Sequence, residues 1–279
     1  MKSNKIYFMI LFALQNLLFA QIYQQKSDIS RSIDNISEGF LSSISVVDIP
    51  IGLAYVGRNL INPSTIGDRI IFGPSNHEME FSEDFGSSKS YSLGSMDKDI
   101  IPNFIFYGRL ASTFLFDSFT NSNIDSKSYQ NIFLFKKSLI YTYVATEVVK
   151  NLIKRERPDG SDNRSFFSGH TSTTFAASTF LALEFNTFYN NWDLTEKDKP
   201  LRVAFKVVTF STLYGWAGYV GYSRLKDKKH FLSDVLVGAA AGSLISYIVY
   251  QHYNDSVFNN LNVSTRNGKD VYLSFGVGL

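Results

Sequence analysis

Two of the four histidines in this 279-residue chain lie beside hydroxyl, glycine and basic residues. The first, His170, follows Ser168 and Gly169 and directly precedes a long apolar segment. This order predicts the first turn of a helix, where free backbone N–H groups face an anion and an imidazole can donate a proton to a leaving oxygen. The alternative is an ordinary helix start without a chemical role.

The second histidine is His230, which lies four residues before Asp234 at the beginning of the last apolar segment. On one helix these two side chains would be neighbours. A carboxylate beside an imidazole fixes its tautomer and leaves the other ring nitrogen free to attack an electrophile. The pair therefore predicts a nucleophilic histidine. The alternative is that Asp234 only complements the helix N-terminus.

Basic residues accompany both histidines. Lys150 and Arg157 are seven residues apart, so two helical turns would place them on one face, and Pro158 is expected to end that helix. Arg224 lies six residues before His230. An arginine can bind two phosphate oxygens with its planar fork, and a lysine adds a mobile charge. Because basic helix ends usually face water, the prediction of an anion site rests on all three clusters together.

The other histidines, the absence of cysteine and the net charge exclude several kinds of site. His77 and His252 lack such neighbours and are predicted to be structural or solvent-exposed. The chain has no cysteine, which excludes disulfides, thiolate metal sites and cysteine nucleophiles. A net charge of +2 gives no reason to expect nucleic acid as a partner.

Long apolar segments dominate the chain from residue 101 onward and predict an all-α core. An amphipathic helix is predicted within residues 21–45, and a long loop over 62–98, which is rich in glycine, serine and acidic residues. Alternating apolar residues over 271–277 predict a short β-strand at the C-terminus. The predicted core helices lie within residues 101–116, 132–153, 171–185, 203–222 and 231–250.

Charged residues interrupt these apolar segments, among them Arg109, Glu147 and Lys206. A charge near the centre of a membrane-spanning helix typically costs about 2.5 to 3.5 kcal/mol. We therefore expect a soluble or membrane-associated helical domain rather than an integral membrane protein.

Residues 1–20 have the features of a secretory signal peptide. A short basic segment is followed by an apolar run that ends at Phe19, and the small residue Ala20 occupies a suitable cleavage position. The sequence thus predicts an exported protein, periplasmic or associated with the outer face of a membrane. An uncleaved anchor is the alternative.

Taken together, the three clusters resemble the signature of the type 2 phosphatidic acid phosphatase (PAP2) superfamily, which includes acid phosphatases, lipid phosphate phosphatases and vanadium haloperoxidases. The family pattern is Lys, six residues, Arg-Pro, then Pro-Ser-Gly-His, then Ser-Arg, five residues, His, three residues, Asp. One position departs from it, because Phe167 stands where the family has proline. The matching residues are Lys150, Arg157-Pro158, Ser168-Gly169-His170, Ser223-Arg224, His230 and Asp234.

The resemblance implies a phosphatase that needs no metal or other cofactor and hydrolyses a phosphomonoester or a lipid (di)phosphate. His230 would be the nucleophile that forms a phosphohistidine, Asp234 would orient it, and His170 would protonate the leaving alkoxide. The phosphoryl oxygens would be bound by Lys150, Arg157, Arg224, the Ser168 hydroxyl and the Gly169 backbone N–H.

The expected domain order is a signal peptide over 1–20, a helical and loop region over 21–124, a PAP2-like helical bundle over 125–255 and a tail over 256–279. Two other functions stay open. One is a vanadium-dependent haloperoxidase, since vanadate fits a phosphate cradle. The other is a non-catalytic phosphate- or lipid-binding relative, which the substitution by Phe167 would favour.

Overall fold

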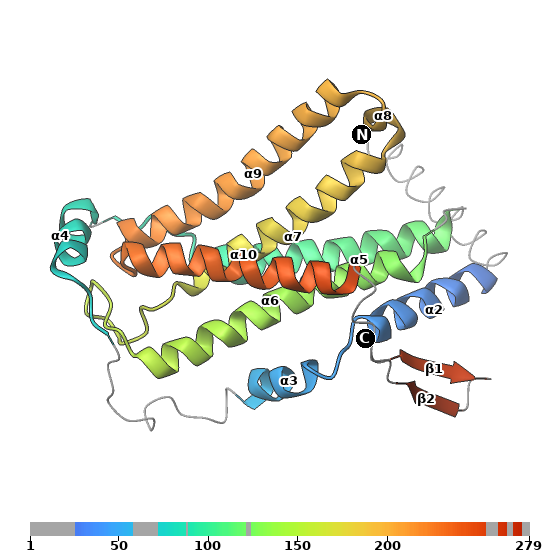
Figure 1. Ribbon diagram of the computed structural model, residues 1–279, viewed down its shortest axis with the longest axis horizontal. Helices are drawn as coiled ribbons and strands as arrows, with labels where there is room; N and C mark the ends of the chain where they lie inside the picture. The colour runs from blue at the N-terminus through green and yellow to red at the C-terminus, as the bar shows by residue number, and fades with distance from the viewer. Residues whose placement is uncertain are drawn as a thin grey trace, which may run out of the picture. The chain divides into compact units, whose positions relative to one another are not determined.

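The computed structural model describes residues 26–57, 72–87, 89–120, 124–254, 262–266 and 270–274, so the predicted signal peptide lies outside the described residues. The described chain is helical except for one C-terminal hairpin (Figure 1), which confirms the all-α prediction. The helices are α2 (Lys26–Ser42), α3 (Asp48–Gly57), α4 (Asn76–Phe85), η2 (Met96–Ile100), α5 (Ile101–Phe119), α6 (Ser126–Ile153), α7 (Gly169–Asn191), α8 (Asp193–Glu196), α9 (Lys199–Lys226) and α10 (Leu232–Asn254).

The apolar segments of the sequence correspond to the long helices. Each of the five predicted core helices is present, as α5, α6, α7, α9 and α10, and the amphipathic segment near the N-terminus forms α2. The alternating residues of the tail form strand β2 (Asp270–Ser274), which pairs antiparallel with β1 (Asn262–Arg266). The end of the predicted strand, residues 275–277, lies outside the described residues.

The prediction of a loop over residues 62–98 is wrong where α4 forms and at its end, where η2 begins at Met96. Ser75 is the N-cap of α4 and accepts a hydrogen bond from the backbone N–H of Glu78, while the Glu78 carboxylate accepts one from the backbone N–H of Ser75. This reciprocal capping satisfies two backbone donors and allows a helix in a polar stretch. Residues 62–71 of the predicted loop lie outside the described residues.

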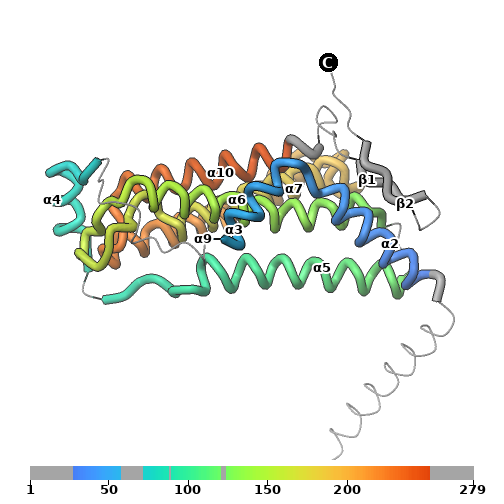
Figure 2. Tube along the Cα trace, turned by 90° about the horizontal axis from the view of Figure 1, so that it is seen from below, coloured from blue at the N-terminus to red at the C-terminus, as the bar shows by residue number. Residues whose placement is uncertain are grey.

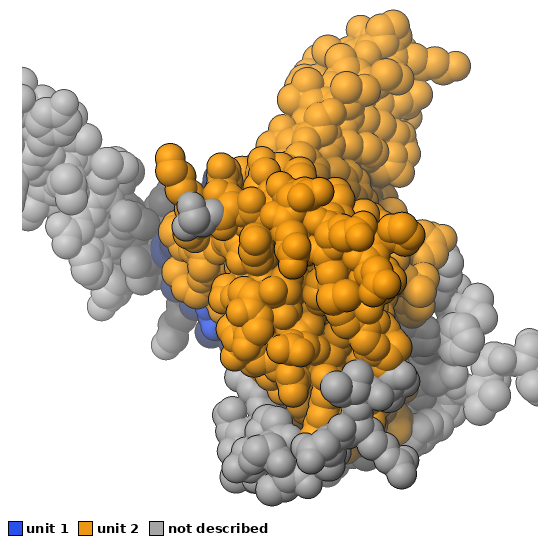
Figure 3. Space-filling view, turned by 90° about the vertical axis from the view of Figure 1, so that its left-hand side faces the viewer, with its two compact units in different colours: residues 1–44, 105–133 blue, residues 45–104, 134–279 orange. Residues whose placement is uncertain are grey.

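The chain divides into two compact units, residues 1–44 with 105–133 and residues 45–104 with 134–279 (Figure 3). In the first unit, the buried carboxylate of Asp117 accepts hydrogen bonds from Arg31, Asn35 and Tyr129. This network joins α2 to α5 and α6. All eight candidate site residues belong to the second unit.

Close packing of α7 against both α9 and α10 organises the second unit (Figures 1 and 2). A Cβ atom on Gly242 would lie 2.0 Å from the carbonyl oxygen of Ser172, so only glycine permits this approach of α10 to α7. Aromatic edge-to-face contacts extend the core, with Phe180 of α7 between Phe135 of α6 and Tyr250 of α10. The ends of these helices are thereby fixed relative to one another.

Candidate active site

Four helix ends in the second unit carry the residues singled out by the sequence. Lys150 lies in the last turn of α6, Arg224 in the last turn of α9, and Asp234 in the first turn of α10. Ser168 is the N-cap of α7, and its backbone N–H donates to the carbonyl of Asp234 over 3.0 Å. The sequence motifs therefore lie together even though about 84 residues separate the first from the last.

Lys150 is a buried cation beside the start of α7. Its side chain is almost fully enclosed, and burial, followed by the neighbouring charge of Arg157, lowers the pKa of its ammonium group to about 7. A Cβ atom on Gly169 would lie only 3.9 Å from Lys150 Nζ. The same Cβ atom would lie 3.3 Å from the Thr146 methyl group, so the start of α7 packs closely on α6 beside this amine.

Arg157 reaches the same region from a loop and not from a helix. The prediction that α6 runs to Pro158 is wrong, because α6 ends at Ile153 and Lys154 adopts a left-handed backbone conformation with φ of 52°. Such a residue ends a helix. The Arg157 guanidinium donates through Nε to Asp162 over 2.6 Å and through Nη1 to the Lys229 carbonyl over 3.4 Å.

Arg224 and His170 are both largely enclosed, and the charge of Arg224 acts on the His170 imidazole. Burial and the charge of Arg157 lower the pKa of Arg224, whose Nε atom is buried without a hydrogen-bond partner in the described part of the chain. Burial, and then the charge of Arg224, lowers the pKa of His170 to about 3. Its Nε2 atom lies 3.1 Å from the carbonyl oxygen of Gly94.

Ser168 begins α7 as expected, despite Phe167 in place of proline. Its Oγ atom accepts hydrogen bonds from the Thr171 backbone N–H over 3.4 Å and from the Thr171 hydroxyl over 2.9 Å. Phe167 is buried and makes an edge-to-face contact with Phe166. The substitution therefore leaves the helix start intact.

His230 lies beside Asp234, but not in the way the sequence suggested. The α10 helix begins at Leu232, so His230 precedes it, and the assumption that both residues share a helix is wrong. The contact arises because the backbone N–H of Phe231 donates to Asp234 Oδ2 over 2.8 Å and turns the loop back. His230 Nδ1 then lies 3.7 Å from the same Oδ2 atom.

The imidazole of His230 is neutral in this environment. Only 2% of the residue is exposed, and this burial, opposed by Asp234 and reinforced by the charges of Lys150 and Arg157, lowers its pKa to about 3. A neutral imidazole retains a lone pair for nucleophilic attack at physiological pH.

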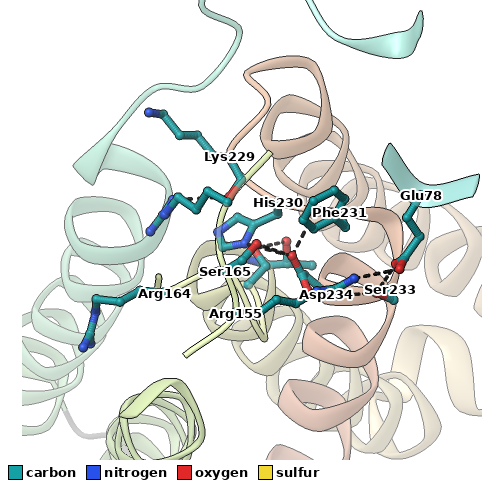
Figure 4. Close-up of polar contacts among 12 residues, drawn as sticks. Glu78, Arg155, Arg164, Ser165, Lys229, His230, Phe231, Ser233 and Asp234 are labelled. Carbon is teal, nitrogen blue, oxygen red and sulfur yellow. Dashed lines mark hydrogen bonds and ion pairs between the residues drawn. The ribbon is translucent and has the colours of Figure 1, made fainter. Parts of the chain in front are cut away.

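Sequence reasoning missed three residues that hold Asp234 (Figure 4). Arg155 donates through Nη1 to Asp234 Oδ1 over 2.7 Å, and the hydroxyl of Ser165 donates to Asp234 Oδ2. Glu78 of α4 binds the other end of the Arg155 guanidinium. Arg155 lies between Lys150 and Arg157 in the sequence, and Ser165 lies three residues before Ser168, but no spacing rule separates an inward-facing arginine from its solvated neighbours.

The other two histidines are not among the residues that the structure brings together at the candidate site. His77, on α4, has 96% of its side chain exposed and an ion-pair distance of 3.8 Å to Glu80. The side chain of His252 lies outside the described residues. Within the described ranges, no three histidine, aspartate or glutamate side chains gather as a metal-ligand cluster.

A cavity of about 150 Å³ is lined by Lys150 and Gly169 of the candidate site. It extends along α6 toward the start of α5, and its walls are mainly polar. The other residues that line it are Tyr55, Lys98, Asp99, Pro102, Asn103, Lys136, Leu139, Ile140, Tyr143, Thr146, Glu147 and Thr173.

Comparison with known proteins gives one family. A family model described as PAP2 superfamily matches residues 132–258. Lipid A 1-phosphatase of Porphyromonas gingivalis is 34% identical over 96 residues, which are 34% of this chain and 18% of that protein. The probable diacylglycerol pyrophosphate phosphatase 1 of Schizosaccharomyces pombe is 37% identical over 92 residues, 32% of this chain and 29% of that protein. The chain thus spans less than a third of these relatives.

Two solved structures are similar over most of the chain. Aquifex aeolicus LpxE has 17% sequence identity and a TM-score of 0.37, over 72% of this chain and 93% of that one. The first transmembrane PAP2 type phosphatidylglycerolphosphate phosphatase from Bacillus subtilis has 18% identity and a TM-score of 0.40, over 81% and 97%.

Proposed function

We propose, from the match of residues 132–258 to the PAP2 superfamily, that the chain is a metal-independent phosphatase of this family that works through a phosphohistidine intermediate. The observation that carries the proposal is the neutral, buried His230, placed 3.7 Å from Asp234 and within the field of Lys150 and Arg157. A carboxylate beside an imidazole, with cations nearby, suits attack on a phosphoryl group.

In the first step, a ring nitrogen of His230 forms a bond to phosphorus while the bond from phosphorus to the leaving oxygen breaks. The imidazolium that forms is stabilised by Asp234. His170 donates a proton to the leaving alkoxide. The negative charge of a bound phosphoryl group raises the pKa of this histidine, so its proton arrives with the substrate.

In the second step, water attacks phosphorus and the nitrogen–phosphorus bond breaks. His170, now neutral, accepts a proton from this water, and inorganic phosphate leaves. Microscopic reversal of acid and base roles on one residue is typical of such two-step hydrolyses.

The cations stabilise the charge that spreads over the phosphoryl oxygens in each transition state. Lys150, Arg157 and Arg224 supply three positive charges from three separate segments. Both observed hydrogen bonds at the Ser168 oxygen are accepted ones, which leaves its hydroxyl proton to donate, and the Gly169 backbone N–H adds a further donor.

We further propose a lipid phosphate or lipid diphosphate as substrate, bound at a membrane surface. Relatives of the matching segment are named as lipid phosphatases, among them phospholipid phosphatase 2 of Bos taurus, 36% identical over 91 residues. Helices whose ends meet at the proposed site carry exposed apolar side chains, including Tyr222 near the end of α9 and Leu236 near the start of α10. The cavity beside Lys150 would receive the polar group that carries the phosphate.

Membrane association has a further structural basis in α10. Among the described residues, the segment Leu232–Gln251 is the one helix long and apolar enough to cross a membrane, and about two thirds of this apolar stretch is not buried inside the protein. We propose that the protein is associated with the outer face of a membrane, as the features of residues 1–20 predict. Sequencing the N-terminus of the mature protein and fractionating cells with and without detergent test both parts.

The test of the activity compares hydrolysis of an aryl phosphate by the wild type and by His230→Ala. His77→Ala is the matched control, because this histidine is 96% exposed on its side chain and lies outside the proposed site. The expected result is metal-independent turnover in the wild type and the control and none in His230→Ala. Equal rates in all three proteins would refute the assignment.

Trapping the intermediate tests the mechanism separately. Rapid acid quenching is unsuitable because phosphohistidine is acid-labile, so alkaline quenching and mass spectrometry are used. Phosphate is expected on His230 in the wild type and at a higher level in His170→Ala assayed with an aryl phosphate, whose leaving group needs little protonation. If no histidine carries a phosphoryl group, water attacks the substrate directly.

A further inference from the structure

Arg155 is the largest side chain among the least exposed residues of the described chain, with 1% exposure. Its Nη1 atom donates to Asp234 Oδ1 over 2.7 Å and to Ser233 Oγ over 2.8 Å. The guanidinium group also lies over the ring of Phe231, 4.6 Å from the centroid. A buried arginine in this setting can adopt few other positions.

The opposite edge of the same guanidinium binds Glu78. Arg155 Nη2 donates to Glu78 Oε2 over 2.7 Å, and the hydroxyl of Ser233 donates to Glu78 Oε1. One arginine thus bridges two carboxylates, one from α4 and one from α10 (Figure 4). Glu78 lies outside residues 132–258, so the match to the family does not include it.

The helix that carries Glu78 is itself anchored to the end of α9. The backbone N–H of Ser87 donates to the Lys226 carbonyl over 2.8 Å, and Lys226 Nζ donates to the Phe85 carbonyl over 2.9 Å. The ammonium of Lys226 also lies 4.0 Å from the centroid of the Phe85 ring. These contacts place α4 independently of its contact with Arg155.

We propose that Glu78 and Arg155 are positioning residues for the reaction, which hold the Asp234 carboxylate so that its Oδ2 atom faces His230. This inference rests on the proposed function of His230. The line of contacts runs from Glu78 through Arg155 and Asp234 to His230, and neither of the first two residues touches the phosphoryl group.

The physical reason is that the two carboxylate oxygens of Asp234 bind different partners. Its Oδ1 atom is taken by Arg155, while Oδ2 accepts from Ser165 and Phe231 and faces His230 Nδ1. Loss of the bond at Oδ1 would let the carboxylate rotate away from the imidazole. Glu78 in turn neutralises Arg155 and fixes its fork, so that this cation does not move toward the phosphate oxygens.

The sharpest variant is Glu78→Gln, because the amide keeps the shape and its oxygen can keep the bond from Ser233, while its NH2 group cannot accept from Arg155 or from the backbone N–H of Ser75. Glu80→Gln is its matched control, on the same helix and with 75% of its side chain exposed. We expect Glu78→Gln to lower kcat for an aryl phosphate about 3-fold to 10-fold, since one charge-assisted hydrogen bond is lost. KM and the inhibition constant of inorganic phosphate stay unchanged, because the cations are untouched.

Arg155→Lys tests the bridge itself. A lysine carries one point charge and cannot bind both carboxylates with a fork. A loss of about 10-fold to 100-fold in kcat is expected, as for displacement of a catalytic group by about 1 Å. In this background, Glu78→Gln should add less than about 2-fold, because coupled residues are not additive. Independent, multiplying effects of the two substitutions would overturn the proposal.

Two further measurements distinguish a positioning role of Glu78 and Arg155 from a purely structural one. If kcat stays at the control value in Glu78→Gln, or if phosphate inhibition weakens as much as kcat falls, the positioning role is wrong. The ring ¹⁵N shifts of His230 give an answer that does not need turnover. Protonation on Nδ1 in the wild type, lost or mixed in Arg155→Lys, supports the proposal even if His230 should prove not to be the nucleophile; identical spectra reject it.

Discussion

The Nδ1 atom of His230 lies 3.7 Å from Oδ2 of Asp234, although His230 is outside the helix that carries the aspartate. The loop before α10 makes this approach by donating the backbone N–H of Phe231 to the same carboxylate oxygen. Asp234 therefore shapes the loop and orients the imidazole with one atom. Substitutions at this carboxylate are expected to be far more damaging to kcat than to substrate binding.

Asp234→Asn tests that expectation. An amide in place of the carboxylate favours the wrong tautomer of His230, so kcat should fall by about 10²-fold to 10⁴-fold with little change in KM. Asp193→Asn is the control, because Asp193 is an exposed residue of α8. Steady-state kinetics on an aryl phosphate measure the change, and a KM effect larger than the kcat effect would assign Asp234 to substrate binding instead.

The lowered pKa of Lys150, about 7, predicts how binding depends on pH. The charged ammonium, present below this pKa, attracts phosphate, so affinity should fall as the pH rises through 7. A phosphoester loses its second proton near pH 6, so its charge is constant from pH 7 to 9. KM should then rise by up to about 10-fold per pH unit, the limit for one linked proton.

Lys150→Arg is the matching variant, because arginine stays charged over this whole range. The rise of KM between pH 7 and 9 should be absent in it. Should the variant and the wild type show the same pH dependence, another group controls binding. Lys150→Met, which carries no charge, should bind weakly at every pH.

The buried His230 should make the free energy of unfolding depend on pH. Its pKa in the folded protein, about 3, lies below the ordinary value of 6.5, so the unfolded chain binds the extra proton first as the pH falls. The free energy of unfolding should therefore decrease as the pH is lowered from about 6.5 toward 3. Carboxylates contribute in the same range, so urea titrations of wild type and His230→Gln are compared. The variant should lose stability less steeply.

Because α10 packs closely against α7 at Gly242, we expect this position to tolerate no side chain. A Cβ atom on Gly242 would lie 2.0 Å from the Ser172 carbonyl oxygen, whereas one on Gly218 of α9 would meet nothing within 4 Å. Gly242→Ala should lower the free energy of unfolding by about 1 to 3 kcal/mol through overpacking. Gly218→Ala should be neutral or stabilising by up to about 1 kcal/mol. Thermal denaturation of both variants gives the comparison.

Several features of this protein follow from its sequence alone. Predominantly apolar segments of this length are typical of helices rather than strands, so α5, α6, α7, α9 and α10 were predictable in order and approximate length. Ser168 before an apolar run predicted an N-cap, which the structure has. The spacing of charged and imidazole side chains identified six of the candidate residues without any coordinates, and the neighbouring Ser168 and Gly169 completed the set of eight.

What the sequence missed depends on the path of the backbone between helices. Lys154 leaves the helical conformation at φ 52°, which ends α6 early and turns Arg155 inward and Arg157 toward Lys229. The contact of Glu78 with Arg155 joins residues 77 positions apart. Helical periodicity describes neighbours within one element, whereas these contacts require the loops to bend and separate helices to pack, and only the tertiary structure decides that.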